Sequence, residues 1–407
     1  MDNFKITNYK EYKYLFKVVA SVVNNCTAPT PPEDINYDVL YKISVVNKLD
    51  SFLVYSINKN NKSLLPIDFQ ENCYVSMSKS LNRAKKIDNT LNMIVGLFEE
   101  NKINNIQLKG SYIKKYYPQI ELRYMVDMDI LISESDEKIA SDLLKNNGFK
   151  LMKSGEVDDL YISPNNILLE LHRKVVDETK KNSNYFSSLW DEKINAGEYK
   201  YSYYLEESMF YTFMVEHCLK HFFAGGFSAR MLLDFYIFNS IIMNDNIKKE
   251  VENKLSKIEL IGFAKELEEI SNRWFSFDGE GLLETCEDAY VVNNGDMATV
   301  SNIVITQAIA LEKSGVNITT SNYLFSKVFI SKKNLQKYYN VLQVKPYLYP
   351  IFYCKYLGFR FKQIFSKTDR FNSFNDIKNI KNSSDEINNT KNLIKKFDIE
   401  QFIEYGG

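Results

Sequence analysis

Residues 124–133 read Tyr-Met-Val-Asp-Met-Asp-Ile-Leu-Ile-Ser, and this stretch decides the fold. Apolar residues alternate with Asp127 and Asp129, which is the period of a β-strand with both carboxylates on one face. The residues that should enter the core from the other face are Val126, Met128 and Ile130. Parallel carboxylates repel each other, so the pair suits either a solvated surface or a divalent cation between them. We expect both side chains to face solvent, so that replacing them leaves the fold intact.

Two flanking stretches strengthen the case for chemistry at this strand. Residues 108–111 (Leu-Lys-Gly-Ser) predict a strand, a glycine turn and a helix start, which offer backbone N–H groups and a hydroxyl to phosphate oxygens. Residues 167–172 (Ile-Leu-Leu-Glu-Leu-His) predict a second strand with Glu170 and His172 on one face. A phosphate-binding turn, a same-face Asp pair and a third acid are what metal-assisted nucleotidyl transfer requires.

The sequence around these motifs alternates strands with helices, whereas most of the remaining chain has helical spacing. The predicted strands are 106–109, 124–133, 149–153, 159–163 and 167–173, and a helix is predicted at 136–147. Helical spacing is also found at 1–25, 37–57, 74–100 and, in pieces, 206–311. We therefore predict an α+β fold, in which a small mixed β-sheet is enclosed by N- and C-terminal helical regions.

Five regions are expected along the chain. They are an N-terminal helical region (1–100), a catalytic core (101–200), a helical domain that closes the cleft (201–315), a basic aromatic helical segment (316–370), and a linker with a terminal helix (371–407). Within the last region, the Asn-, Ser- and Lys-rich residues 372–390 predict a flexible linker, and residues 393–404 predict a short helix.

Composition excludes several classes of protein. The chain has 407 residues, 45% of them hydrophobic and 25% charged, which is typical of a globular protein and not of a disordered one. Lys plus Arg total 51 against 52 for Asp plus Glu, so no global field attracts DNA or an anionic membrane. Residues 1–17 are too polar for a signal peptide, and no apolar run has the length of a membrane span. We expect a cytoplasmic protein. The five scattered cysteines argue against a disulfide framework.

A Gly-Ser turn followed by Asp-x-Asp and a later strand acid resembles the DNA polymerase β-type nucleotidyltransferase superfamily. Within it, residues 34–360 are similar to a largely uncharacterised bacterial group of nucleotidyltransferase family proteins. The motifs that carry this likeness are 108–111, Tyr117-Pro118, Arg123, 127–132, Gly148-Phe149, 170–172, Glu216-His217, His221, Arg230, Leu233-Asp234 and 346–360. The spacing from Ser111 to Asp127 is longer than in minimal nucleotidyltransferases, and the superfamily also contains inactive members.

The resemblance implies roles for the core residues. Asp127 and Asp129 would hold Mg²⁺ (or Mn²⁺) with a nucleoside triphosphate, for which ATP is the expected donor. Glu170 would complete a second metal site or accept the acceptor's proton, and its alternative is an ordinary strand-surface acid. Gly110 and Ser111 would bind the β- and γ-phosphates, and their alternative is a bare tight turn.

The cations and histidines near this site leave more alternatives open. Lys109 and Arg123 could neutralise the leaving pyrophosphate, or form structural ion pairs with Asp127 or Asp129. His172 could orient Glu170, contact nucleotide, or be satisfied by neighbouring groups. The resemblance places the helix that carries His217 against the nucleotide cleft.

Two further patterns have structural explanations that compete with the functional ones. His217 and His221 lie one helical turn apart, but Lys220 stands where an inverted zinc-protease motif has glutamate, so we disfavour zinc. Residues 323–370 interleave cations with aromatics, and the pattern could engage RNA or could be helices that pack aromatics inward. We favour packing. The resemblance also implies that Asp234 holds a histidine or Arg230 beside the cleft, and the alternative is a buried polar network.

The function that follows is Mg²⁺-dependent transfer of a nucleoside monophosphate from a nucleoside triphosphate to an acceptor hydroxyl or phosphate, with release of pyrophosphate. The acceptor is unknown, and a small molecule is favoured over RNA or protein. The alternatives are a tRNA-modifying nucleotidyltransferase toxin and an inactive nucleotide-binding module.

Overall fold

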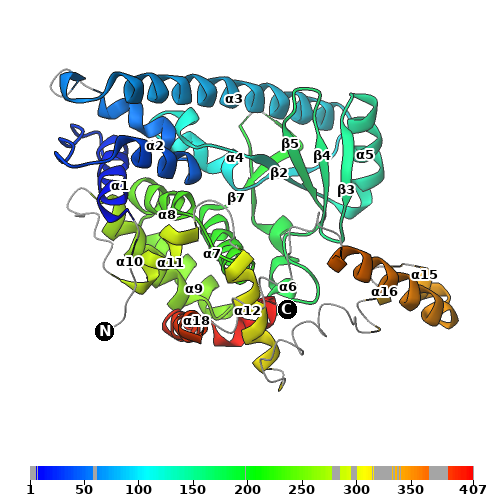
Figure 1. Cartoon of the computed structure of the whole chain (residues 1–407). Coiled ribbons are helices and arrows are strands. Elements are labelled where there is room, and N and C mark those ends of the chain that lie inside the picture. Colours follow the sequence, from blue (N-terminus) through cyan, green and yellow to red (C-terminus); the bar gives the residue numbers. More distant parts are fainter. Residues whose placement is uncertain are drawn as a thin grey trace. The chain divides into compact units, whose positions relative to one another are not determined.

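The computed structural model describes residues 6, 8–57, 62–197, 199–276, 285–294, 300–313, 315, 332, 335–336, 339, 341–365 and 384–406. The chain divides into two compact units (Figure 1). Unit 1 comprises residues 1–219 and 227–297, and unit 2 comprises residues 220–226 and 298–407. Among the described residues, none of the helices combines the length and apolar character of a membrane span.

Unit 1 contains the mixed sheet that the sequence predicts, so the α+β class is confirmed. Its strand order is β3-β4-β5-β2-β1-β7-β6. The strands are β1 (Asn105–Gln107), β2 (Asp127–Ile132), β3 (Lys150–Ser154), β4 (Asp158–Ile162), β5 (Leu168–His172), β6 (Lys193–Asn195) and β7 (Ser202–Leu205). β2 runs parallel to β5 and antiparallel to β1, and β1 runs parallel to β7. The sequence analysis missed β6 and β7.

Helices precede, cover and follow this sheet. They are α1 (Tyr9–Val23), α2 (Tyr37–Val46), α3 (Ile67–Glu100), α4 (Gly110–Ile113), α5 (Glu137–Asn146), α6 (Ser183–Phe186), α8 (Ala229–Ile241), α9 (Asp245–Lys257), α10 (Ile261–Phe275) and α11 (Cys286–Asn294). Single turns of 3₁₀-helix lie at Lys62–Leu64, Lys114–Tyr116, Ile120–Leu122, Glu134–Asp136 and Leu189–Glu192, and a longer one lies at Asp50–Ser56. α3 begins before the predicted residue 74, and helical spacing at 37–57 divides into α2 and the 3₁₀-helix.

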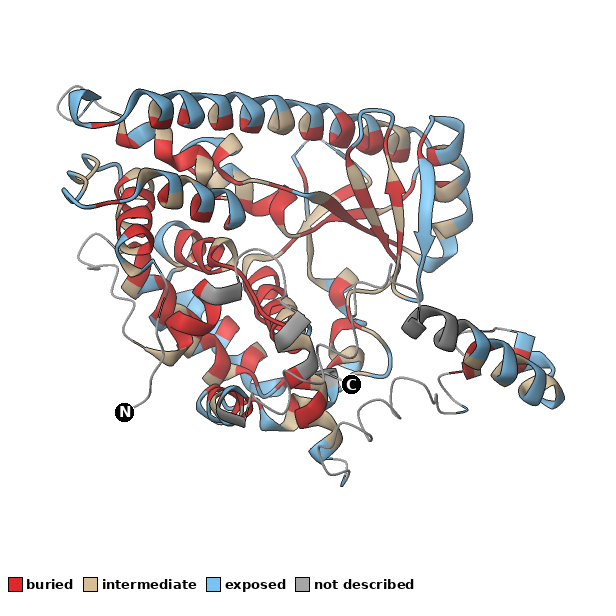
Figure 2. Ribbon diagram, in the orientation of Figure 1, coloured by how far each residue is buried: buried red, intermediate tan, exposed pale blue. Residues whose placement is uncertain are grey.

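An apolar core lies between one face of the sheet and helices α3 and α5. The two helices contribute Ile87, Leu91, Ile94, Val95, Phe98, Ala140 and Leu144, and the strands contribute Met128, Ile130, Ile132, Leu169 and Leu171. Figure 2 shows α3 buried along the side that faces the sheet and exposed along its outer side. Alternation along β2 therefore places its apolar residues in this core and its carboxylates on the other face.

Val126 does not enter the core as predicted, because it precedes the strand. Its side chain is 37% exposed, and its carbonyl accepts a hydrogen bond from Arg83 Nη2 at 2.6 Å. β2 begins only at Asp127. Side chains alternate between the two faces only within the strand, so the alternation does not predict the position of a residue that precedes it.

Helix α7 (Glu207–Phe223) crosses the boundary between the units, which follows Leu219. Unit 2 contains α12 (Val300–Lys313), α15 (Val341–Val344), α16 (Tyr349–Phe365), α18 (Ser384–Lys396) and 3₁₀-helices at Pro346–Leu348 and Glu400–Gly406. The linker predicted at 372–390 is therefore wrong from Ser384 onward, because α18 has an amphipathic face that buries Ile387, Leu393 and Ile394. The helix predicted at 393–404 divides into the end of α18 and a 3₁₀-helix.

The described part of the basic aromatic segment packs its rings together. Leu335, Leu342 and Tyr356 form a small apolar cluster, with Tyr339 and Phe352 against it. The ammonium groups of Lys332 and Lys355 lie over aromatic rings of the same cluster, 5.8–5.9 Å from the ring centroids. This arrangement agrees with inward packing of aromatics. Lys333 and Lys337, which also belong to the predicted basic segment, lie outside the described residues.

Candidate active site

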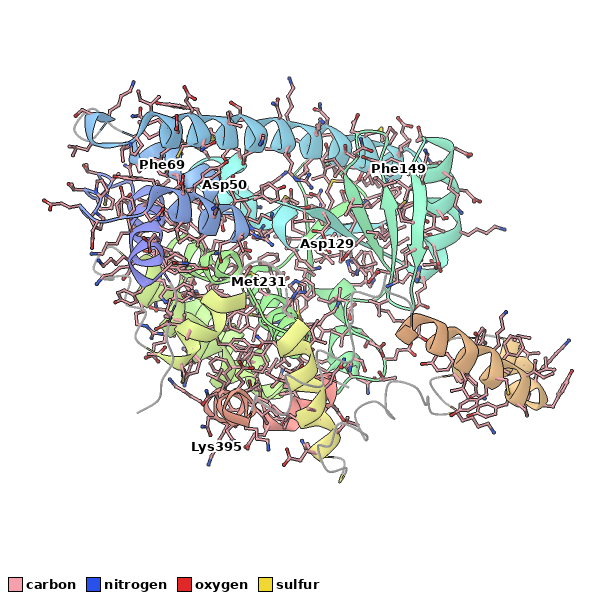
Figure 3. The ribbon with its side chains drawn as sticks, viewed as in Figure 1. Asp50, Phe69, Asp129, Phe149, Met231 and Lys395 are labelled. Carbon is pink, nitrogen blue, oxygen red and sulfur yellow. The ribbon has the colours of Figure 1, made fainter. Side chains whose placement is uncertain are left out.

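Parallel pairing of β2 with β5 brings the predicted acids together on one face of the sheet. Asp129 pairs with Glu170 in register, and Asp127 pairs with Leu168. Paired residues on neighbouring strands point to the same face, so Asp127, Asp129 and Glu170 share the face opposite the α3 core. Figure 3 shows Asp129 on the sheet of unit 1. Acids that are 41 positions apart in the sequence thus become neighbours.

Asp129 is buried, contrary to our expectation of a solvated side chain. It is 3% exposed. Lys109 Nζ donates to Asp129 Oδ1 at 2.6 Å, and His172 Nε2 lies 3.0 Å from the same oxygen. These two side chains cover the carboxylate, and both supply it with positive charge or a hydrogen bond. Replacing Asp129 therefore leaves a buried ammonium without its partner, and the fold is not indifferent to it.

Glu170 completes a compact group with Asp129 and His172. Its Oε2 lies 3.4 Å from His172 Nε2 and 3.8 Å from Lys109 Nζ, and its side chain is 30% exposed. One ligand atom from each of Asp129, Glu170 and His172 can be chosen so that all lie within 4.8 Å of one another. Asp127, which we expected to share the first metal site with Asp129, is not one of these three. The metal-binding roles of all three acids stay predictions.

The neighbouring carboxylates have opposite pKa shifts. Burial raises the pKa of Asp127 to about 6, and repulsion from Asp129 adds to this. Burial acts in the same direction on Asp129, but the Lys109 charge and the His172 hydrogen bond outweigh it and hold the pKa of Asp129 well below its usual range. Asp129 is therefore ionised at neutral pH, whereas Asp127 is close to its titration range.

Asp129 and its neighbours also raise the pKa values of the two nearby bases. Burial lowers the pKa of the Lys109 ammonium, but Asp129, Glu170 and Asp127 outweigh burial and raise it. Hydrogen bonds with Asp129 and Glu170 likewise outweigh burial at His172 and raise its pKa. The site thus pairs anionic and cationic groups in a protected environment, which is typical of functional sites.

The turn before α4 is strained at Lys109 and not at the glycine. Lys109 has φ 47° and ψ −122°, a conformation that a residue with a Cβ rarely adopts. A Cβ on Gly110 would lie 3.1 Å from Met125 Cγ, so any other residue there would require the Met125 side chain to shift by a few tenths of an ångström. The predicted glycine turn is thus present, but the unusual backbone falls one residue earlier and aims the Lys109 ammonium at Asp129.

Ser111 follows this turn and is buried. It is 3% exposed, and its Oγ has no hydrogen-bond partner among the described residues. A buried hydroxyl without a partner costs free energy, roughly 1–3 kcal/mol, unless something outside the chain satisfies it. The phosphate-binding role of Gly110 and Ser111 stays a prediction.

Arg123 pairs with Asp234, a partner that the sequence analysis did not consider for it. Its Nε and Nη2 donate to the two carboxylate oxygens of Asp234, each at 2.6 Å, and both residues are buried. Tyr117 Oη donates to Asp234 Oδ1 at 2.7 Å. The expectation that Asp234 holds a histidine or Arg230 stays a prediction. Arg123 joins the segment before β2 to α8 through this pair, and its role toward pyrophosphate also stays a prediction.

Arg230, on α8, is a cation that acts on Asp127. The sequence analysis did not predict this interaction. Its charge lowers the pKa of Asp127, and its Nη1 donates to the Tyr124 carbonyl at 3.3 Å. The sequence feature that could have indicated this residue is its place in the helical motif of the family that the chain resembles. His217 lies on α7, half-buried, with its ring centroid 6.1 Å from that of Phe213. The nucleotide-binding role of His217 stays a prediction.

Comparison with known proteins places this site in a family. A search of curated proteins found no significant match. Among solved structures, the solution structure of the antibiotic-resistance factor ANT(2'')-Ia is similar at a TM-score of 0.33 and 9% identity, over 44% of this chain and 95% of that one. A similarity at that level does not support any conclusion about the function of this chain. A family profile described as "Uncharacterised nucleotidyltransferase" matches residues 33–261, more than half of the chain. The chain therefore belongs to this family of uncharacterised nucleotidyltransferases.

Proposed function

We propose that this chain transfers a nucleoside monophosphate, with ATP as the expected donor, to a hydroxyl or phosphate acceptor and releases pyrophosphate. The observation that carries the proposal is the in-register pair Asp129 and Glu170, with Asp127 on the same face. Family membership supports the general reaction. The donor base, the metal and the acceptor are parts of the proposal.

The donor groups of the site fit Mg²⁺. Asp127, Asp129 and Glu170 offer carboxylate oxygens, the ligands that Mg²⁺ prefers together with water and phosphate. When bound, the metal would neutralise charge on the phosphates. His172 is better assigned as a hydrogen-bond donor, because neighbouring acids raise its pKa and its Nε2 already contacts Asp129. It would hold the Asp129 carboxylate in one orientation.

The remaining groups would bind and position the donor. Lys109 supplies a fixed ammonium beside the carboxylates, where it can neutralise phosphate charge. The partnerless Ser111 hydroxyl could donate to a phosphate oxygen, which would relieve the cost of its burial. Glu170, whose side chain is 30% exposed, is the candidate to accept the acceptor's proton.

The test is binding of ATP, CTP, GTP and UTP by thermal shift, each with and without Mg²⁺. We expect stabilisation by at least one nucleotide that depends on Mg²⁺ and is lost in Asp129→Ala. Asp159→Ala is a matched control, because Asp159 is also a buried sheet carboxylate with a cationic partner, Arg173, 3.2 Å away. If the control loses the nucleotide effect as well, or if Asp129→Ala retains it, the proposed metal site is wrong.

A further inference from the structure

A cavity of about 590 Å³ lies in unit 1 at the far end of β2 and β5. Leu131 lines it from β2, and Val176, Phe186, Leu189 and Trp190 line it from the segment that follows β5. Ser133, Glu134, Lys174, Ser183, Asn184 and Ser187 supply polar groups to its lining. Its volume is in the range of small-molecule sites, roughly 300–1,000 Å³.

The cavity lies on the same face of the sheet as the carboxylates. Leu131 follows Asp129 by two residues, so both side chains point to the same face of β2. The register agrees, because Leu131 pairs with His172 and Asp129 pairs with Glu170. At about 3.3 Å per residue, Leu131 is roughly 7 Å along the strand from Asp129. A ligand in the cavity would reach the catalytic acids without crossing the sheet.

The cavity and the Gly-Ser turn lie at opposite ends of β2. β1 is antiparallel to β2, and Leu108 N donates to the Asp129 carbonyl at 3.0 Å, so the turn at 109–111 lies near the first residues of β2. The cavity contacts Ser133, just beyond the last residue of β2. In phosphoryl transfer the attacking and leaving oxygens are roughly in line on opposite sides of the phosphorus. Pyrophosphate held at the turn would therefore require an acceptor from the cavity side.

We infer that this cavity binds the acceptor, and that the acceptor is an uncharged, hydroxyl-bearing small molecule with a planar or apolar ring. The inference rests on the proposed function. In the transfer step, the acceptor oxygen bonds to the α-phosphorus, the bond from that phosphorus to the bridging oxygen breaks, pyrophosphate leaves, and the acceptor's proton passes to Glu170.

The walls of the cavity are built to hold a ring. Phe186 is buried, and its ring lies edge-on to Phe213 of α7 with the centroids 6.4 Å apart. Asn182 Nδ2 donates to the buried Glu216 Oε2 at 2.8 Å, which ties the start of α6 to the same helix. Trp190 is half-buried and offers part of its indole to the cavity. An aromatic wall favours stacking with a planar or apolar ring.

The charges around the cavity compensate one another. Its lining has two cations and two acids, Arg173 and Lys174 with Glu134 and Glu178. Lys174 Nζ pairs with Glu134 at 2.8 Å and also with Glu178. Arg173 Nη1 pairs with Glu137 at 2.9 Å, outside the lining. A polycation or a nucleic-acid backbone would have to break these pairs, whereas a neutral hydroxylated ligand can use the serine hydroxyls and the Asn184 amide.

Trp190 provides a direct readout of occupancy. The chain has two tryptophans, and the other, Trp274, is fully buried. The probe is phenyl β-D-glucopyranoside, which carries an apolar ring and hydroxyls but no charge and no nucleobase. We expect it to change the tryptophan fluorescence of the full chain saturably, and we expect Trp190→Phe to remove the change. Kanamycin, a polycation, and a short single-stranded oligoribonucleotide, a polyanion, should give no saturable change.

A blocking variant tests the location independently. Ser183→Tyr should place a ring inside the cavity and weaken glucoside binding about five- to twelvefold, since a displaced stacking contact is worth roughly 1–1.5 kcal/mol. Ser188→Tyr is the matched control, because Ser188 is exposed in the same segment but does not line the cavity. Equal affinity in both variants, a saturable response to kanamycin or the oligonucleotide in place of the glucoside, or no response to any probe overturns the inference.

The two proposals fail separately. Nucleotide binding that depends on Mg²⁺ and Asp129, with no glucoside response, would overturn the acceptor cavity and leave the proposed function standing. A glucoside response that requires Trp190, with no nucleotide binding, would overturn the proposed function and the acceptor assignment together.

Discussion

The two faces of β2 show how one strand serves two purposes. Met128, Ile130 and Ile132 are fully buried and belong to the apolar core between the sheet and helices α3 and α5. Asp127 and Asp129 point the other way, toward Lys109 and Glu170. The apolar face gains stability from every buried side chain. The acidic face holds like charges close together, which costs stability.

The largest expected effect is on turnover, at Asp129. Asp129→Asn should reduce pyrophosphate release from the nucleoside triphosphate at least a thousandfold, roughly 4 kcal/mol of transition-state free energy. The amide cannot supply the charge that a divalent cation needs. The measurement is single-turnover release with Mg²⁺ and excess enzyme. Activity within tenfold of wild type would remove Asp129 from the catalytic group.

The adjacent residue, Ile130, should show the reverse pattern. Ile130→Ala should lower the free energy of unfolding by about 2–5 kcal/mol, because it leaves a cavity in the α3 core. Turnover per folded molecule should stay within a few-fold of wild type. Chemical denaturation measures the first quantity and active-site-normalised kinetics the second. A large loss of turnover at full folding would show that the two faces are coupled.

The effect of Asp127 on the free energy of unfolding should depend on pH. The carboxyl has a folded pKa of about 6 against an ordinary value of 3.8, so the native state binds more protons than the unfolded state between these values. Its destabilising effect is therefore absent below about pH 4, grows as pH rises, and is complete above about pH 6. Asp127→Asn should stabilise the protein by on the order of 3 kcal/mol at pH 8 and by much less at pH 4.

Denaturation of wild type and Asp127→Asn at pH 4, 6 and 8 checks this expectation. Saturating Mg²⁺ should reduce the difference at pH 8 if the metal binds the ionised carboxylate. A stability difference that does not change with pH would contradict a raised pKa at Asp127.

The smallest expected effect is a difference in stability between two variants at Lys109, the residue with the strained backbone. Lys109→Ala and Lys109→Gly both remove the ammonium, but only glycine accepts φ 47° and ψ −122° without strain. The glycine variant should be more stable than the alanine variant by about 1–2 kcal/mol. Chemical denaturation of the two variants side by side measures the difference. Equal stabilities would mean that the turn relaxes once the ion pair with Asp129 is gone.

Local patterns predicted much of unit 1. The alternation within 127–132 identified β2, and the Gly-Ser and Asp-x-Asp spacing identified the elements that carry the site. The short strands β6 and β7 escaped prediction, whereas β1, which is equally short, was predicted with the help of the glycine that follows it. β7 covers only Ser202–Leu205, and its parallel pairing with β1 comes from residues 97 positions earlier in the sequence. Segments of that length have too few side chains to display a period, so only the partner strand shows that they are strands.

The sequence by itself determined the class of fold, the shared face of Asp127 and Asp129, and the presence of a Gly-Ser turn, because each follows from the spacing of neighbouring residues. Tertiary structure decided that Asp129 is buried under Lys109 and His172, that Arg123 pairs with Asp234, and that the backbone strain falls on Lys109. Those features depend on which distant elements pack together. In each case the burial of apolar surface brings the elements together, and the polar groups must then find partners within that arrangement.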